Sequence, residues 1–313
     1  MITTGKHKGK TFEHVLANDE PYCRKILNGM RISNDSLSRL KIYLEEHMTS
    51  TIDTTKLHHM HRINAMKLID DYMIRDVDIS KVCSNIEFKE CMSIKYGYPQ
   101  FVIDSKIQSI YGQFMDYLMR HYIMSKTDSV ISDSRTSSVV EYHPSLRKSY
   151  DIYCSNKDTR SIISHIWNVC IGHSVVFGSM ESMMYLDIDE KFIEDDVLNY
   201  VISSCDKIIS RGEDIMCNPD IGSPYLGVQA DADIVYGNTI LDIKTSTKNI
   251  SSRRNKLQLI LYASLYRHKY DKKLHRLILF NPLGSMCIAN ISNIDFENDI
   301  IDIITRYSIG SSI

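Results

Sequence analysis

The chain has 313 residues, of which 43% are hydrophobic, and it carries a formal net charge of −2. That length and composition suit one main globular domain plus a smaller module, with enough apolar residues for a sizeable core. A near-neutral charge excludes a chain that is basic throughout, so any contact with nucleic acid must come from a local basic patch.

Targeting and cofactor signals are sparse. No run of 18 apolar residues occurs, which predicts no membrane-spanning helix and no membrane partner. The first ten residues, MITTGKHKGK, lack the apolar core of a signal peptide, so we expect an intracellular protein, cytoplasmic or nuclear and not secreted. The eight cysteines are scattered, and we therefore expect neither a disulfide framework nor an iron–sulfur cluster. The sequence does not indicate the oligomeric state.

Residues 1–48 are predicted to form a small basic module that ends in a helix over residues 36–47. Lys6, Lys8 and Lys10 alternate with other residues, including glycines, and such a segment favours an exposed hairpin or loop that binds phosphates. The alternative is a solvated lysine-rich terminus. The segment resembles the short domain at the C-terminus of exodeoxyribonuclease X, which implies nucleic-acid binding. A polar linker separates it from the main domain, residues 57–313.

The main domain alternates between helical and strand patterns. Helices are predicted over residues 62–76, 104–124, 158–171, 195–212 and 295–307. Strands are predicted over residues 173–179, 183–189, 275–282 and 285–292, the last two joined as a hairpin. Strands mixed with flanking helices indicate an α/β fold with a central mixed sheet.

Residues 231–246, DADIVYGNTILDIKTS, are predicted to form a further hairpin. Gly237 and Asn238 suit a two-residue turn in which both central residues need unusual backbone angles. Directly opposite residues point to the same face of a hairpin. The facing pairs are then Tyr236 and Thr239, Asp233 and Asp242, and Asp231 and Lys244.

This register places the four ionisable residues on one hydrophilic face. The other face carries Ala232, Ile234, Leu241 and Ile243 and is expected to be buried. Two facing carboxylates repel each other unless a divalent cation lies between them, and carboxylate oxygens suit hard ions such as Mg²⁺. The alternative is a solvated strand face with an Asp–Lys pair across the strands.

The spacing of Asp233, Asp242 and Lys244 resembles the core of the PD-(D/E)XK nuclease superfamily, in its RecB-like, lambda-exonuclease-like branch. That family also carries a Gln-x-x-x-Tyr helix after this motif, which Gln258 and Tyr262 match. Its upstream helix has a glycine and then a metal ligand four residues later. Gly112 and Asp116 have this spacing, although Asp116 stands where the branch usually has histidine.

The resemblance implies a restriction-endonuclease-like core that hydrolyses phosphodiester bonds with Mg²⁺ or Mn²⁺. The substrate is expected to be DNA, cleaved in an exonuclease-like manner in repair, recombination or replication. An RNA endonuclease of the same fold and an inactive nucleic-acid-binding protein remain alternatives. The implied metal ligands are Asp116, Asp233, Asp242 and the Ile243 carbonyl, and the implied catalytic residues are Asp233, Asp242, Lys244, Gln258 and Tyr262.

Basic residues after the hairpin are candidates for nucleic-acid binding. Lys248, Arg253 and Arg254 flank the motif and are able to hold phosphates of the substrate strand, although each on its own is equally consistent with ordinary surface charge. Asp231 is expected either to support the ligands or to replace one of them if the register of the hairpin slips. Asp116 has its own alternative, an exposed helix acid paired with Arg120 at i+4.

Overall fold

The computed structural model describes residues 63–92, 95–127, 143–176, 180–224 and 226–310. The chain divides into two compact units, Met1–Asn64 with Ser223–Gln229, and Ala65–Gly222 with Ala230–Ile313. Among the described residues of the first unit, β1 (Ile63–Asn64) pairs in parallel with β4 (Val228–Gln229). The basic module predicted over residues 1–48, with Lys6, Lys8 and Lys10, lies outside the described residues.

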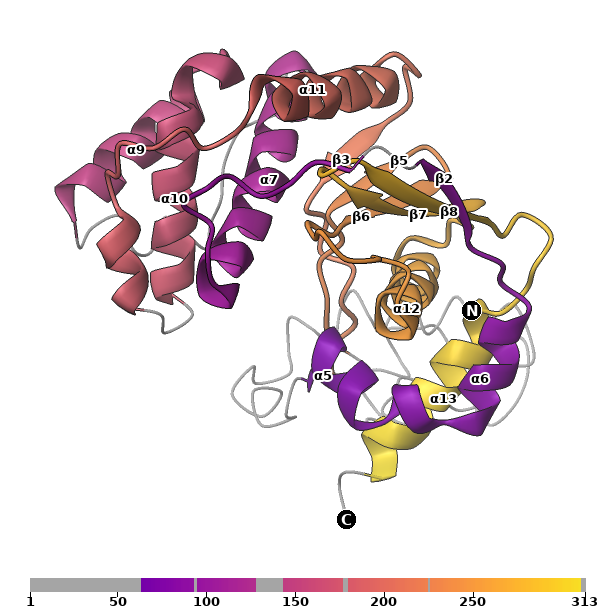
Figure 1. Ribbon diagram of the computed structural model, residues 1–313. Helices are drawn as coiled ribbons and strands as arrows, with labels where there is room; N and C mark the ends of the chain where they lie inside the picture. Colours follow the sequence, from indigo (N-terminus) through magenta and orange to yellow (C-terminus); the bar gives the residue numbers. More distant parts are fainter. Residues whose placement is uncertain (1–62, 93–94, 128–142, 177–179, 225, 311–313) are drawn as a thin grey trace, which may run out of the picture. The chain divides into compact units, whose positions relative to one another are not determined.

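The second unit is built on a six-stranded sheet in the order β2-β8-β7-β6-β5-β3 (Figure 1). Its strands are β2 (Lys89–Met92), β3 (Ile215–Cys217), β5 (Ile234–Tyr236), β6 (Thr239–Ile243), β7 (Arg276–Asn281) and β8 (Ser285–Asn290). β6 and β7 are parallel and the other neighbours are antiparallel. A parallel pair needs a crossover connection, and here α12 supplies it. The prediction of an α/β fold with a mixed central sheet flanked by helices is confirmed.

Helices make up most of the rest of this unit. The α-helices are α5 (Ala65–Asp71), α6 (Val77–Ser84), α7 (Ser105–Lys126), α9 (Pro144–Ser155), α10 (Ile163–Val176), α11 (Asp195–Ile209), α12 (Arg253–Tyr270) and α13 (Glu297–Gly310), and the short 3-10 helices are η1 (Met73–Arg75), η3 (Thr159–Ile162) and η4 (Met180–Tyr185). Side-chain caps start the two helices that matter most for the site. Asp104 accepts hydrogen bonds from two amides at the start of α7, and Ser252 accepts one from Asn255 N at the start of α12.

The two faces of the sheet pack against different helices. Ile234, Leu241 and Ile243 belong to a core shared with α7, α10 and α11, as expected for the apolar face of the hairpin. The opposite face is covered by α12, which packs on β6 and β7 and is itself covered by α5 and α13. Figure 1 shows α12 on one side of the sheet and α11 on the other. Because α12 lies between the sheet and other helices, all residues from Leu257 to Tyr266 are buried.

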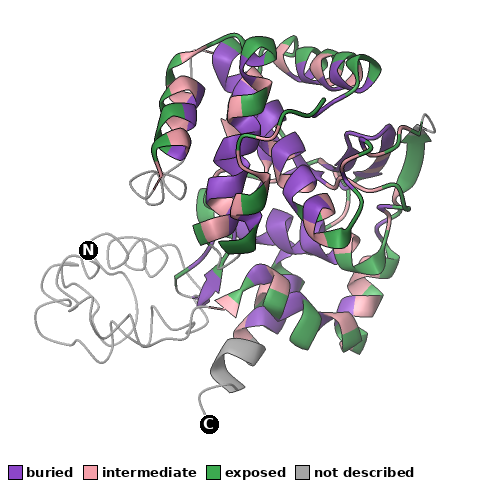
Figure 2. Cartoon of the chain, turned by 60° about the vertical axis from the view of Figure 1, so that its left-hand side comes forward, coloured by how far each residue is buried: buried purple, intermediate pink, exposed green. Residues whose placement is uncertain are grey.

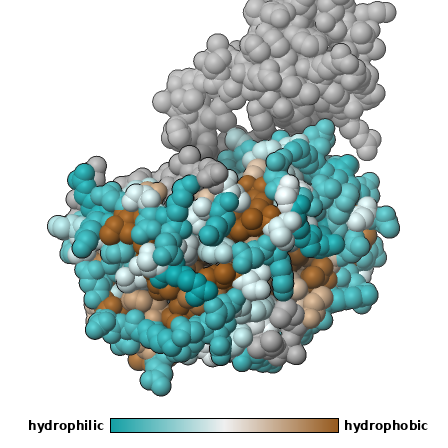
Figure 3. Space-filling view, turned by 90° about the horizontal axis from the view of Figure 1, so that it is seen from above, coloured by the Kyte–Doolittle hydropathy of each residue, from teal (hydrophilic) through white to brown (hydrophobic). Residues whose placement is uncertain are grey.

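Buried residues run along the sides of the helices that face one another and the sheet (Figure 2). Seen from above, apolar areas on the described surface are broken up by hydrophilic side chains (Figure 3). Ile103 and Met184 are the most exposed large apolar residues of the described part of the chain, at 78% and 76%. None of the helices that the structure describes is both long and apolar enough to cross a membrane.

Several predicted elements are confirmed, including the helices at α7 and α11 and the hairpin of β7 and β8. The strand predicted over residues 183–189 is wrong, and the strand predicted over residues 173–179 is wrong at residues 173–176, since residues 177–179 lie outside the described residues. Residues 173–176 continue α10, and most of residues 183–189 lie in or just after η4. For residues 173–176 the reason is that most of α10 is buried, and a short apolar run in a buried helix has the same pattern as a buried strand. Residues 183–189 are half-buried or exposed, so their apolar side chains do not mark a buried strand. The helix predicted over residues 62–76 is divided into β1, α5 and η1.

Candidate active site

The hairpin that carries the predicted motif is formed in the predicted register. Tyr236 pairs with Thr239 and Ile234 pairs with Leu241, around the turn at Gly237 and Asn238. Gly237 has a φ of 49°, but Asn238 does not have a positive φ, so only one central residue takes an unusual backbone angle. Hairpin turns that need a positive φ at the first position alone favour glycine there, which explains the order of these two residues.

Asp242 is the buried centre of the site. It lies in β6 and is 1% exposed, because α12 covers this face of the sheet. Its Oδ1 accepts hydrogen bonds from Lys244 Nζ and from Gln258 Nε2, each at 3.0 Å. Its Oδ2 accepts no hydrogen bond, although Lys244 Nζ lies 2.8 Å away. The alternative of a solvated strand face is therefore wrong at Asp242, because a helix that follows in sequence packs over it.

The surroundings of Asp242 disfavour its negative charge. Burial raises the pKa of its carboxyl group to about 7, the charge of Asp233 adds to this, and Lys244 opposes it. Burial by itself favours the neutral form of Lys244, but Asp242, Asp233 and Asp116 outweigh it and raise the pKa of the ammonium group. The Lys244 side chain remains 26% exposed. A lysine cation thus stands between a buried carboxylate and the surface.

Asp233 ends the pairing of β5 with β6. Its Oδ2 accepts a hydrogen bond of 2.6 Å from the amide of Ile243, the predicted carbonyl ligand. Before β5 the chain turns to residues 218–221, where Asn218 N donates to the carbonyl of Asp233 at 2.8 Å. Asp231 therefore bridges to Asp220, and the predicted pairing of Asp231 with Lys244 is wrong. The register has not slipped, so no structural reason exists to exchange Asp231 for Asp233.

Gln258 and Tyr262 lie one turn apart on α12, on its side that faces β6. Gln258 Nε2 donates both to Asp242 Oδ1 and to Tyr262 OH, the latter at 2.9 Å. Both residues are buried, at 5% and 6% exposed. The spacing of four residues thus places the glutamine on the carboxylate and the tyrosine behind the glutamine.

Asp116 approaches the hairpin from α7. It forms an ion pair with Arg120, and its side chain is 21% exposed. Burial raises the pKa of Asp116 to about 7, Arg120 opposes this, and the charges of Asp233 and Asp242 add to it. Asp116 is therefore paired with Arg120, as the alternative interpretation expected. Its carboxyl group also feels the charges of Asp233 and Asp242, as the metal-ligand interpretation requires. A Cβ on Gly112, one turn before Asp116, would lie 3.9 Å from Thr245 Cβ, so α7 passes close to the end of β6.

Buried polar atoms without a hydrogen-bond partner gather at this site. Among the described residues six side-chain atoms are of this kind, and one of them, Glu297 Oε1, lies elsewhere, in α13. Native proteins leave few buried polar groups unpaired, and such groups often mark a place where water, an ion or a ligand supplies the partner. The other five are Asp116 Oδ1, Arg120 Nε, Asp242 Oδ2, Thr245 Oγ1 and Gln258 Oε1.

These donor atoms fit a small hard cation. Mg²⁺ keeps several of its waters and takes one or two carboxylates plus substrate phosphate. Asp233 and Asp242 offer that pair, and Asp116 adds a third carboxylate, whose buried Oδ1 accepts no hydrogen bond. As placed, no three His, Cys, Asp or Glu side chains of the described residues gather closely enough to form a ligand set on their own. The fit therefore rests on two carboxylates with Asp116 nearby.

The predicted phosphate-binding residues differ in their surroundings. Lys248 is exposed on the loop after β6. Arg253 donates to Ser80 Oγ at 2.6 Å. Arg254 pairs with both carboxylate oxygens of Asp70, at 2.6 and 2.8 Å, so its charge is already balanced.

The sequence predicted only that Arg120 pairs with Asp116. It did not predict that Arg120 itself belongs to the site. Its guanidinium lies 4.5 Å from the ring centroid of Tyr117, and Tyr117 OH lies 2.7 Å from His173 Nδ1. The available signal was the i+4 spacing from Asp116. Thr245, whose buried Oγ1 lacks a hydrogen-bond partner, gave no signal beyond its position after Lys244. The described cysteines, Cys83, Cys91, Cys154, Cys170, Cys205, Cys217 and Cys287, are free thiols.

Comparison of the chain with models of protein families, with curated proteins and with solved structures found no match.

Proposed function

We propose that this protein is a metal-dependent nuclease with a restriction-endonuclease-like core that hydrolyses phosphodiester bonds of DNA. The observation that carries the proposal is the cluster of unpaired buried polar atoms around Asp242, contributed by α7, the end of β6 and α12. A purely structural Asp–Lys pair would not need three elements to bring unsatisfied carboxylate, guanidinium and amide atoms together.

Asp233 and Asp242 would hold the cation, with Asp116 as the third acid. When bound, Mg²⁺ or Mn²⁺ would offset negative charge on the phosphate and make water more acidic. Asp233 is fixed by the amide of Ile243, at 2.6 Å from its Oδ2, and Asp242 is fixed by Gln258, at 3.0 Å from its Oδ1. Two carboxylates aimed by neighbouring hydrogen bonds do not need to reorganise when the cation arrives.

Lys244 would contact the substrate. Its ammonium group is held on Asp242 and kept protonated by the surrounding carboxylates, yet the side chain is partly exposed. A cation in that position neutralises a phosphate oxygen and orients the attacking water, and it does so best where charge develops in the transition state. Gln258 would hold Asp242 in place, and Tyr262 would hold Gln258 through the hydrogen bond of 2.9 Å.

The test is cleavage of labelled linear DNA, circular DNA and RNA, each with Mg²⁺, with Mn²⁺ and with EDTA. Asp242→Asn and Lys244→Ala should each abolish cleavage while circular dichroism shows a folded protein. Asp78→Asn and Lys81→Ala are matched controls, because these residues form an exposed Lys–Asp pair on α6, at 3.5 Å. The controls should cleave like the unaltered protein, since exposed pairs contribute little to stability.

The outcomes separate the proposal from its alternatives. Cleavage of RNA and not of DNA would replace the substrate and keep the site. Cleavage of linear but not circular DNA would identify an exonuclease. Unaltered cleavage by Asp242→Asn or Lys244→Ala would overturn the proposed site. No cleavage of any polymer, together with intact binding of DNA, would favour the inactive nucleic-acid-binding protein.

A further inference from the structure

A basic site separate from the candidate active site lies on the helical side of the same unit, at the C-terminal end of α7. It is a pocket of about 530 Å³, bordered by Tyr122 and Lys126 of α7, by the segment 157–160 before α10, and by Ile202 of α11. Three cations border it, Lys126, Lys157 and Arg160, and all three are exposed. None of them was singled out by the sequence analysis, and none belongs to the candidate active site.

The acids next to this pocket are already engaged in hydrogen bonds. Asp158 caps η3 by accepting a hydrogen bond from Arg160 N at 3.2 Å. Asp206 accepts one of 2.8 Å from Tyr122 OH. Within the described part of the chain Lys126 and Arg160 have no ion pair with an acid. Lys126 Nζ lies over the ring of Tyr122, 5.6 Å from its centroid, and the Arg160 guanidinium donates to the neutral amide of Asn199 at 2.8 Å. The ammonium group of Lys126 and the guanidinium group of Arg160 therefore remain available to bind an anion.

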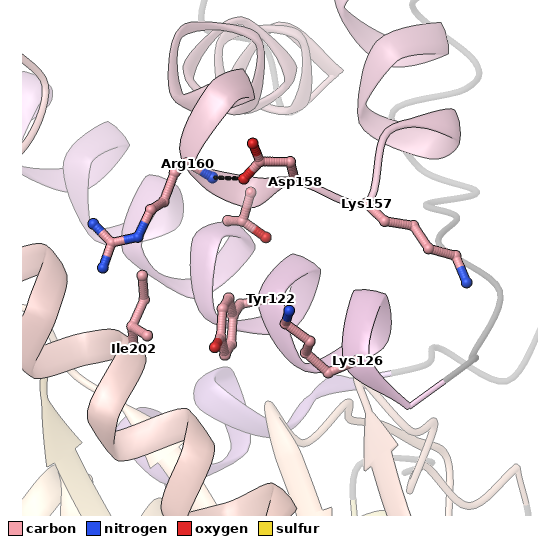
Figure 4. A pocket seen from close by; sticks show the side chains of 7 residues that line it. Tyr122, Lys126, Lys157, Asp158, Arg160 and Ile202 are labelled. Atoms are coloured by element: carbon pink, nitrogen blue, oxygen red, sulfur yellow. Dashed lines mark hydrogen bonds between the residues drawn. The ribbon is translucent and has the colours of Figure 1, made fainter.

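The cations do not converge on one point. Figure 4 shows Arg160 and Lys157 extending to opposite sides of the pocket, with Lys126 between them below Asp158. A single small anion would be recognised by donors that point at one spot, whereas a chain of phosphates meets cations that are spread along its path. The arrangement therefore matches a polyanion better than a single phosphate ion.

The pocket and the candidate active site share one rigid element. Tyr122 and Lys126 follow Asp116 by six and ten residues on α7, which corresponds to about 9 and 15 Å along a helix axis. In a helically stacked strand that distance covers about three to four nucleotides. Measured along α7, the pocket thus lies a few nucleotides from Asp116, and a strand that binds at both must also pass about a quarter to a third of the way round the helix.

We propose that the pocket bordered by Lys126, Lys157 and Arg160 binds backbone phosphates of a nucleic-acid strand a few nucleotides from the cleavage site. This rests on the proposed nuclease function for the identity of the strand, but the binding itself needs no cleavage. The contacts are to phosphate, so they position the strand and carry no base specificity.

The test measures binding of a fluorescently labelled single-stranded 20-nucleotide DNA by anisotropy, in EDTA, over a series of salt concentrations. The variant combines Lys126→Ala, Lys157→Ala and Arg160→Ala. The control combines Lys67→Ala, Lys148→Ala and Lys191→Ala, three exposed lysines away from the pocket, so the change in net charge is the same. Thermal melting establishes that both proteins are folded.

The pocket variant should bind on the order of tenfold more weakly at low salt, and its salt slope should fall by about 1.4 to 2, as expected for two to three lost phosphate contacts to a single strand. The control should show a much smaller change in both. Equal affinity and equal slope for the two variants would overturn the proposal. So would full competition by inorganic phosphate at a phosphate concentration equal to that of the DNA, because it would identify a site for a small anion.

A second measurement keeps the two proposals apart. If the protein cleaves DNA, the pocket variant should raise KM and leave kcat nearly unchanged, since its residues do not touch the reacting phosphate. If the protein cleaves nothing, the anisotropy result still decides whether the pocket binds a strand. Cleavage with an unchanged KM in the pocket variant would overturn the pocket and leave the active site standing.

Discussion

The substitution Arg120→Met tests how Arg120 stabilises the fold, through its ion pair with Asp116 or through its contact with the ring of Tyr117. Methionine has a similar reach and keeps apolar contact with the tyrosine ring, so the substitution removes mainly the charge. The side chains of Arg120 and Asp116 are 10% and 21% exposed. Removing one partner of a buried ion pair costs about 3–5 kcal/mol. Because Asp116 keeps some contact with water, we expect about 3 kcal/mol at pH 8.

The loss should depend on pH, with a sign that follows from Asp116. Burial raises its pKa in the folded protein to about 7, from an ordinary value of 3.8, and Arg120 opposes that rise. Without Arg120 the pKa must rise further. A carboxyl group whose pKa is higher in the folded than in the unfolded state binds protons on folding, so the free energy of unfolding increases as the pH falls from above 7 towards 4. The deficit of Arg120→Met should therefore shrink at low pH.

The assay is urea unfolding in EDTA at pH 8 and at pH 5.5, each compared with the unaltered protein at the same pH. Asp116→Asn with Arg120→Met serves as the matched double variant, because it removes the unpaired charge as well. We expect the single variant to lose about 3 kcal/mol at pH 8 and clearly less at pH 5.5, and the double variant to regain much of the loss. An equal loss at both pH values, with no recovery in the double variant, would show that the charge of Arg120 acts through its cation–π contact with Tyr117 and not through Asp116.

Two further predictions concern the helices on either side of the sheet. Gln258→Leu removes the donor shared by Asp242 and Tyr262, so it should lower the free energy of unfolding by about 1–3 kcal/mol and reduce cleavage. Urea unfolding and the DNA assay measure this, and unchanged values in both would contradict the role given to Gln258. Gly112→Ala should raise the free energy of unfolding by about 0.5–1 kcal/mol and leave cleavage intact, because its Cβ would make an ordinary contact with Thr245. Cleavage lost from a stabilised Gly112→Ala protein would instead mean that substrate passes at this position.

The local part of the site was predictable from the sequence. A Gly-Asn turn between two strand-forming triplets determines the register of β5 and β6, and the register brings Asp233 and Asp242 near each other just beyond the last pair, Ile234 with Leu241. The helical spacing of Gln258 and Tyr262 likewise predicts a shared side of α12. Each of these inferences stays within one hairpin or one helical turn, where backbone geometry alone relates the side chains.

The features that were missed depend on distant parts of the chain. The burial of Asp242 comes from α12, and the engagement of Arg254 comes from Asp70, 184 residues earlier. Asp231 was displaced because the segment before β5 pairs with residues 218–221, a contact that no pattern within the hairpin indicates. The strand predicted at the end of α10 has a different origin, since periodicity does not separate a buried helix from a buried strand.

The net charge of the candidate active site links the proposed binding of a metal ion to the proposed binding of substrate phosphate. With all groups ionised, the three carboxylates of Asp116, Asp233 and Asp242 and the two cations of Arg120 and Lys244 sum to −3 + 2 = −1. A site with that charge repels phosphate, whereas one divalent cation would change the sum to −1 + 2 = +1 and make it attract phosphate. The pocket at Lys126 has no such requirement, because its cations are not surrounded by an excess of acids. We therefore expect binding in EDTA to come from basic groups outside the Asp242 site, the pocket among them, and added Mg²⁺ to strengthen binding through the Asp242 site. Asp242→Asn raises the sum without metal to −2 + 2 = 0, so it should not weaken binding in EDTA, while it should reduce the gain from Mg²⁺.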